Sequence, residues 1–232
     1  MEPARKPLFD MSWLKVVLVI FVMEVALFAA LSFVTLPADQ ANSLLNDTQG
    51  LVSQLQNDTL ISKTIDIFVN NVRIALEEFV PGLGWYLFFG VTLTTGQIYS
   101  ALGSSSGVPA ALLLITTFLS PHAWFELAAY AVAVAESILL VNAVFRRSLR
   151  FEVRRAAGAV LLVVAMLFFA ASLEAISIEY SFEGFACAWV VTAVVAFTVY
   201  WLFRSSRRRL GAPPPFGSER PDEAPSSFSA QP

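Results

Sequence analysis

LSPHAWFELAAYAVAVAES, Leu119 to Ser137, is the stretch of sequence that decides how the chain folds. It contains the chain's single histidine, His122, and two glutamates, Glu126 and Glu136, within a run that is otherwise almost entirely apolar. An ionisable side chain in lipid costs free energy, so it normally faces protein or water and often marks a functional site. The run therefore predicts a membrane helix with one polar face.

The polar side chains of this stretch fall on one stripe of a helix, with small residues between them. The stripe consists of His122, Glu126, Ala129, Ala133 and Glu136. A polar stripe lined by alanine is expected to face other helices or a water-filled space rather than lipid. Helix packing and assembly is the favoured use of the stripe; a proton or ion path is the second, and catalysis the weakest.

The composition of the 232-residue chain indicates an integral membrane protein with several spans. Hydrophobic residues make up 56% of it and charged residues 14%, against about 45–50% and about 25% in soluble domains. The single cysteine excludes an intrachain disulfide and a thiolate metal cluster, and the single histidine excludes a two-histidine metal site. The stretch GSSSG at 103–107 has the letters of a GxSxG nucleophile motif, but it is interpreted more simply as a flexible turn. We therefore expect no cofactor, no metal and no enzymatic activity.

Apolar runs along the chain predict an all-α bundle of about six transmembrane helices. The predicted spans are 13–36, 82–102, 107–120, 122–145, 156–173 and 185–203. The first carries Glu24 near its middle. The third is short, so it is either a short span or a re-entrant half-helix, in which case four crossings would remain. Ser120 and Pro121 fit the cap and the first position of the following helix.

Residues 65–80 predict an amphipathic helix that is interfacial or buried against other helices. Its candidate polar contacts are Asn70, Asn71, Arg73 and Glu77. We expect this helix to pack against the polar stripe of 122–145, with His122 or Arg73 meeting a glutamate. The two asparagines are expected to hydrogen-bond across helices.

The distribution of basic residues predicts the topology, because cytoplasmic loops are enriched in lysine and arginine. Basic clusters occur at the N-terminus, at 146–155 and at 204–209, so both termini are expected in the cytoplasm of a multi-pass protein of the cell membrane. An acidic link at 174–184 is expected outside. The predicted segments are a cytoplasmic N-terminus with the first span (1–36), an extracytoplasmic segment (37–63), the main membrane domain (64–203), and a basic, then disordered cytoplasmic tail (204–232).

Three motifs in this order resemble the stage II sporulation protein M family of membrane proteins. They are IFVNNVRIALEEFVPGLGW, the later TTGQ, and SPHAWFELAAYAVAVAES, and they cover Ile65 to Val141. The residues that match the family's pattern are Phe68, Asn70, Asn71, Gly82, Pro121, His122 and Glu126. The chain departs from the pattern at Thr95, Ala123, Ala128 and Glu136. It thus resembles a divergent member of the family, and an archaeal source would fit.

The resemblance implies a non-enzymatic multi-span protein that recruits or organises partner proteins, with His122 and Glu126 as its motif pair. Sporulation itself is not implied. We expect the lipid bilayer, unidentified membrane or extracytoplasmic proteins and further copies of the chain as partners, and no nucleic acid. We also expect His122 and Glu126 to lock helix 122–145 to helix 65–80. The alternative is a permease or channel subunit whose path is lined by Glu24, His122, Glu126 and Glu136.

Overall fold

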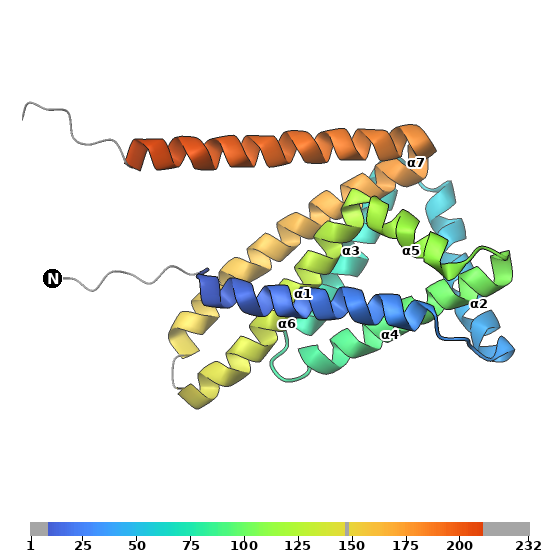
Figure 1. The fold of residues 1–232 in the computed structure, drawn as a ribbon, viewed down its shortest axis with the longest axis horizontal. Helices are drawn as coiled ribbons and strands as arrows, with labels where there is room; N and C mark the ends of the chain where they lie inside the picture. Colours follow the sequence, from blue (N-terminus) through green and yellow to red (C-terminus); the bar gives the residue numbers. More distant parts are fainter. Residues whose placement is uncertain (1–8, 147–148, 211–232) are drawn as a thin grey trace, which may run out of the picture. The chain divides into compact units, whose positions relative to one another are not determined.

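The computed structural model describes residues 9–146 and 149–210, which form helices joined by short connections (Figure 1). The helices are α1 (Met11–Ser32), α2 (Ala38–Asn57), α3 (Leu60–Glu78), α4 (Gly84–Ser106), α5 (Ala110–Leu119), α6 (Pro121–Arg146) and α7 (Leu149–Leu210). The predicted all-α class is confirmed, since the described residues contain no strand. The disorder predicted for the tail from residue 211 onward lies outside the described residues.

Local sequence signals explain where several helices begin and end. Asp10 accepts a hydrogen bond from the backbone N–H of Trp13 (2.9 Å), which caps α1. Gly107, at φ +68°, ends α4 in the left-handed conformation that glycine tolerates. Pro121 begins α6 as the sequence predicts. The hydroxyl of Ser120, just before it, donates to the carbonyl of Thr116 in α5 (3.1 Å).

The helix α6 is the centre of the bundle. It packs against α1, α3, α4 and α5, and every residue from 131 to 137 is buried. The enclosed segment is rich in alanine, and Ala131, Ala133 and Ala135 are fully buried. Small side chains let neighbouring backbones approach closely. In lipid the hydrophobic effect does not favour association of helices, so they associate through close van der Waals packing of this kind.

The helix α3 lies within the bundle, which decides between the two readings of 65–80. Lys63, near its start, forms an ion pair with Glu179 of α7. Just past its end, the carbonyl of Val80 accepts a hydrogen bond from the Ser137 hydroxyl of α6 (2.8 Å). Its 19 residues cover about 28 Å. The helix therefore packs beside α6 and α7 with one face, while its opposite face is exposed.

The helix α5 is too short to cross a bilayer and does not run along the bundle. Its 10 residues cover about 15 Å, half of the roughly 30 Å of hydrocarbon. Gly103 of α4 lies beside Ala110 at the start of α5. Tyr99, one turn earlier in α4, bonds Thr117 near the end of α5 (2.7 Å). Both ends of α5 thus lie at the same end of α4.

Within the described residues, three helices are long and apolar enough to cross a membrane: α1, α6 and the Leu149–Trp201 part of α7. The predicted count of six spans is therefore not confirmed by length and composition. The acidic link predicted at 174–184 is helical over most of its length, and the break between the two helical parts of α7 lies within it, at Ser181 (φ 50°, ψ −120°). Beyond this break, Gly184 lies against the backbone of Ile176, where a Cβ atom would come 2.2 Å from the Ile176 carbonyl oxygen.

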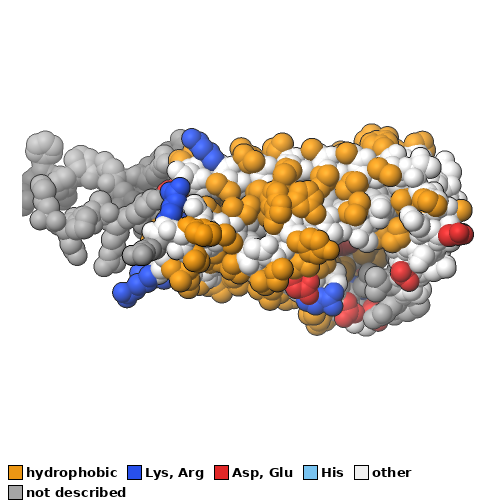
Figure 2. Space-filling model, turned by 90° about the horizontal axis from the view of Figure 1, so that it is seen from below, with side chains coloured by type: hydrophobic (Ala, Val, Ile, Leu, Met, Phe, Trp, Pro, Cys, Tyr) orange, Lys and Arg blue, Asp and Glu red, His pale blue; other side chains and the backbone are white. Residues whose placement is uncertain are grey.

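The chain divides into two compact units after Val190, and all the interactions described below lie within the first. The described part of the second unit is the apolar C-terminal section of α7. Figure 2 shows most lysine and arginine side chains at one end of an apolar surface, and most aspartate and glutamate side chains toward the other end, with one basic group among them. This separation of charge about an apolar belt is typical of an integral membrane protein.

We predict that Gly96→Ala destabilises the protein by about 1–3 kcal/mol, because overpacking forces backbones apart. A Cβ atom at Gly96 of α4 would lie 2.5 Å from the Leu31 Cβ atom of α1. Thermal unfolding in detergent measures the effect. Gly90→Ala is the control on the same helix, since nothing lies within 4 Å of its added Cβ atom, and it is expected to leave stability unchanged or slightly higher. Equal effects of the two substitutions would contradict the close α1–α4 contact.

Candidate functional site: two polar centres inside the helix bundle

The first polar centre is a buried ion pair between α6 and α7. The guanidinium of Arg155 donates to the carboxylate of Glu136 through Nε (3.0 Å to Oε1) and Nη2 (3.2 Å to Oε2). Glu136 is 0% exposed and Arg155 is 5% exposed. The two-pronged arrangement suits arginine, whose planar fork matches a carboxylate.

Two further groups complete this centre. The indole Nε1 of Trp13, in the first turn of α1, donates to Glu136 (2.5 Å). Glu152, one turn before Arg155 on α7, forms a second ion pair with its guanidinium. One carboxylate therefore joins α1, α6 and α7. The arrangement satisfies charges that would otherwise be expensive to bury.

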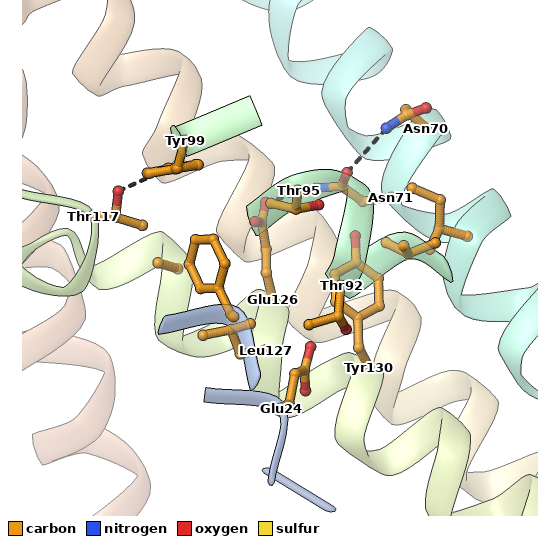
Figure 3. Close-up of a pocket in the computed structure, with 14 residues that line it drawn as sticks. Glu24, Asn70, Asn71, Thr92, Thr95, Tyr99, Thr117, Glu126, Leu127 and Tyr130 are labelled. Atoms are coloured by element: carbon orange, nitrogen blue, oxygen red, sulfur yellow. Dashed lines mark hydrogen bonds between the residues drawn. The ribbon is translucent and has the colours of Figure 1, made fainter. Parts of the chain in front are cut away.

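The second polar centre is a cavity of about 240 Å³ that α1, α3, α4, α5 and α6 enclose (Figure 3). Its lining combines acids, amides, hydroxyls and aromatic rings. The polar lining residues are Glu24, Asn70, Asn71, Thr92, Thr95, Tyr99, Thr117, Glu126 and Tyr130. Asn70 and Thr95 are exposed, whereas Glu24 and Thr92 are buried, so the cavity opens between α3 and α4 and ends against α1.

A hydrogen bond links α3 and α6 at the wall of this cavity. The Asn71 amide donates to Oε1 of Glu126 (2.6 Å). Glu174 of α7 lies close to Glu126. Asn70 donates to Asn71 at 3.4 Å, a longer contact.

Glu24 is the least satisfied side chain of the cavity. It is 4% exposed, and its Oε2 atom is buried without a hydrogen-bond partner. Figure 3 shows its carboxyl directed into the space beside Thr92 and Tyr130. A buried polar atom without a partner costs free energy, so it needs an explanation.

The structure separates the residues of the predicted polar stripe. Glu126 lines the cavity, while Glu136 lies outside its lining in the ion pair with Arg155. His122 does not line the cavity either, and its Nδ1 atom is buried without a hydrogen-bond partner. We expected His122 to contact a glutamate, but it forms no hydrogen bond with one in the described part of the chain. Asn71, not His122, connects Glu126 to α3.

The remaining predicted residues lie as follows. Arg73 and Glu77 of α3 are 71% and 50% exposed and lie 3.5 Å apart, so Arg73 pairs within its own helix and does not reach α6. An exposed ion pair such as Arg73–Glu77 contributes only about 0.3–0.5 kcal/mol to stability. Pro121 is buried at the start of α6.

Sequence reasoning missed the partners of the buried acids. Arg155 belongs to the basic cluster read as a topology signal, and Glu174 to the link expected outside the membrane. Glu136 itself was the signal in the sequence that could have predicted the ion pair, because an acid in the middle of an apolar helix requires a partner. Arg155 directly precedes the apolar run at 156–173 and was the basic residue nearest to that membrane segment.

The fold and the two polar centres define an all-helical integral membrane protein with a charged, hydrogen-bonded interior. The model of the stage II sporulation protein M family matches residues 16–177, and the chain belongs to that family. The match contains the whole segment that carries the resemblance. Neither the curated proteins nor the solved structures that were searched gave a match.

We predict that Arg155→Met lowers the free energy of unfolding by about 3–5 kcal/mol, because it leaves the Glu136 carboxylate buried without its cation. Adding Glu136→Gln should recover part of the loss, since the amide oxygen still accepts from Trp13. Chemical or thermal unfolding of the purified protein measures both changes. Arg154→Met, at an exposed neighbouring position, is the control and should change stability little. A double variant less stable than Arg155→Met would contradict the pairing.

We predict that Asn71→Ala and Glu126→Ala are coupled in a double-mutant cycle by about 0.6–2 kcal/mol, the usual range for hydrogen bonds between membrane helices. The cycle is measured from unfolding free energies. His122→Ala combined with Glu126→Ala should show a smaller coupling, because the Nδ1 atom of His122 makes no hydrogen bond. A larger coupling energy for the His122–Glu126 cycle would indicate that this pair, and not Asn71–Glu126, holds α6 to α3.

Proposed function

We propose that the protein is a non-enzymatic membrane scaffold that recruits or organises partner proteins, and that α2 is its docking element. The observation that carries the proposal is α2 itself. It is a polar helix of 20 residues placed between the apolar α1 and the helices of the bundle. A helix this polar is not stabilised by contact with lipid. We therefore assign it a role outside the apolar belt.

The attachment of α2 supports this role. The helix packs against α4, and Leu45 is its buried anchor at 8% exposure. Asp39, Ser43 and Asp47 lie on exposed positions. A narrow apolar stripe therefore holds the helix, and its wide polar face is free for a soluble or membrane-anchored partner.

The rigid interior supports the same role, because a scaffold must hold its docking element in one position. The carboxylate of Glu136 fixes α1, α6 and α7 to one another. The Ser100 hydroxyl of α4 donates to the carbonyl of Val34 (2.5 Å), just before α2 begins. Such hydrogen bonds tie the connection to α2 to the bundle.

In this proposal both termini are cytoplasmic and α2 is extracytoplasmic. The basic residues near the ends of α1, α6 and α7 support that orientation. The proposed crossings are α1, α3, α4, α6 and the two parts of α7 on either side of Ser181, so that α3 takes the place expected for residues 107–120. Association with further copies of the chain is part of the proposal.

A permease or channel subunit is the second candidate, because the polar cavity with Glu24 and Glu126 opens between α3 and α4. Glu136 and His122 lie outside its lining. The path that the sequence suggested through all four residues is thus interrupted at Glu136, whose carboxylate is occupied by Arg155. Flux of protons or small ions across reconstituted vesicles would favour this candidate.

The scaffold is tested by affinity purification of the tagged full chain from its native membranes in a mild detergent, followed by mass spectrometry. We predict a partner in fixed ratio whose recovery falls severalfold in the variant Asp39→Lys with Asp47→Lys. The reason is that charge reversal on a docking face places like or unmatched charges against the partner. Asp66→Lys, at an exposed position of α3, is the matched control.

The outcomes are distinct. A partner lost only from the α2 variant supports the proposal. A homogeneous assembly of the chain alone, unchanged by the α2 substitutions, would contradict partner recruitment through α2 and bring the second candidate forward.

A further inference from the structure

The polar cavity has an excess of acidic groups. Two carboxyl groups, those of Glu24 and Glu126, line the cavity. Within the described ranges, no basic side chain lines it or forms a hydrogen bond or ion pair with either carboxyl. Lys63 pairs with Glu179 and Arg155 with Glu136 instead. The cavity therefore holds acidic groups without a basic partner.

Among the acidic side chains of the cavity, Glu24 is the one whose carboxyl has an unpaired oxygen. Its side chain is more than nine-tenths buried, its Oε2 atom has no partner, and it points into the cavity (Figure 3). It therefore differs from Glu126, whose carboxylate accepts a hydrogen bond from Asn71. A cationic group placed beside Glu24 would meet an open acceptor and remove an uncompensated buried polar atom.

The shape and lining of the cavity define the kind of cation. No group of three or more His, Cys, Asp or Glu side chains in 9–146 and 149–210 is arranged to hold a metal ion. The cavity's volume of about 240 Å³ exceeds the roughly 150 Å³ that accommodates benzene. The rings of Phe28, Tyr99 and Tyr130 line it, and aromatic faces attract organic cations.

We propose that this cavity binds a small organic ammonium ion, whose charged group pairs with Glu24 and whose apolar part lies among the aromatic rings. Entry is between α3 and α4, where the lining residues Asn70 and Thr95 are exposed. Asn71 and Thr92 provide further polar contacts at the wall. The inference goes beyond the scaffold role and does not depend on it, because partner recruitment was assigned to α2.

Benzylammonium chloride is a suitable probe, since it joins an ammonium group to an aromatic ring of fitting size. The full-length protein is placed in nanodiscs of uncharged lipid, and its thermal unfolding is followed by tryptophan fluorescence. Binding to the folded state raises the unfolding temperature in a saturable way. Benzyl alcohol, which has nearly the same shape without the charge, and sodium chloride at equal ionic strength are expected to give no such rise.

Two variants locate the site. Glu24→Gln should weaken the apparent affinity for benzylammonium by at least about tenfold, because it removes one partner of a buried charge pair. Glu77→Gln removes a carboxylate that is 50% exposed on α3 and should leave the affinity unchanged. Thr95→Trp fills the mouth from an exposed position and should abolish binding, which keeps the test available if Glu24→Gln does not fold.

Each outcome decides the proposal. A saturable rise with benzylammonium that Glu24→Gln and Thr95→Trp remove and Glu77→Gln retains supports it. A rise that is absent, that Glu24→Gln leaves unchanged, or that sodium chloride reproduces overturns it. None of these results bears on the recovery of a partner through α2, so the two proposals fail independently.

Discussion

The buried ion pair between Glu136 and Arg155 is the interaction on which the rest of the structure depends. A bilayer offers neither side chain water, so each must find its partner inside the protein. The carboxylate also accepts from Trp13 of α1, and the guanidinium also meets Glu152. The consecutive helices α6 and α7 are thereby joined to α1, which is far from them in sequence, and the alanine-rich centre of α6 closes around this point.

The second constraint is the same rule applied to α3. This helix has too many charges to face lipid, so its polar side must be turned toward other helices or away from the hydrocarbon. Lys63 and Asn71 meet Glu179 and Glu126, while Arg73 pairs with Glu77 at the surface. The polar cavity follows from this packing, because a helix with amides and acids on its inner side leaves a polar space beside α4 and α6.

The two polar centres suit different tasks. The Glu136 centre is closed and neutralised, as a structural lock requires. The cavity is open at Asn70 and Thr95 and keeps Glu24 unpaired, as a binding site requires.

The sequence by itself determined the helical class, the membrane environment, the family and the face of α6 that carries His122, Glu126 and Glu136. The class, the environment and the face of α6 follow from hydropathy and from a 3.6-residue period, which are local properties; the family follows from the resemblance of three sequence motifs. Only the tertiary structure decided that α3 lies in the bundle, that α5 does not run along it, and that Arg155 and Asn71 are the partners of the two glutamates. In the sequence, a charged residue next to an apolar run looks the same whether it lies in a loop or forms a buried ion pair. The choice depends on which helices meet, and that is set by packing between segments more than a hundred residues apart, such as Trp13 and Glu136.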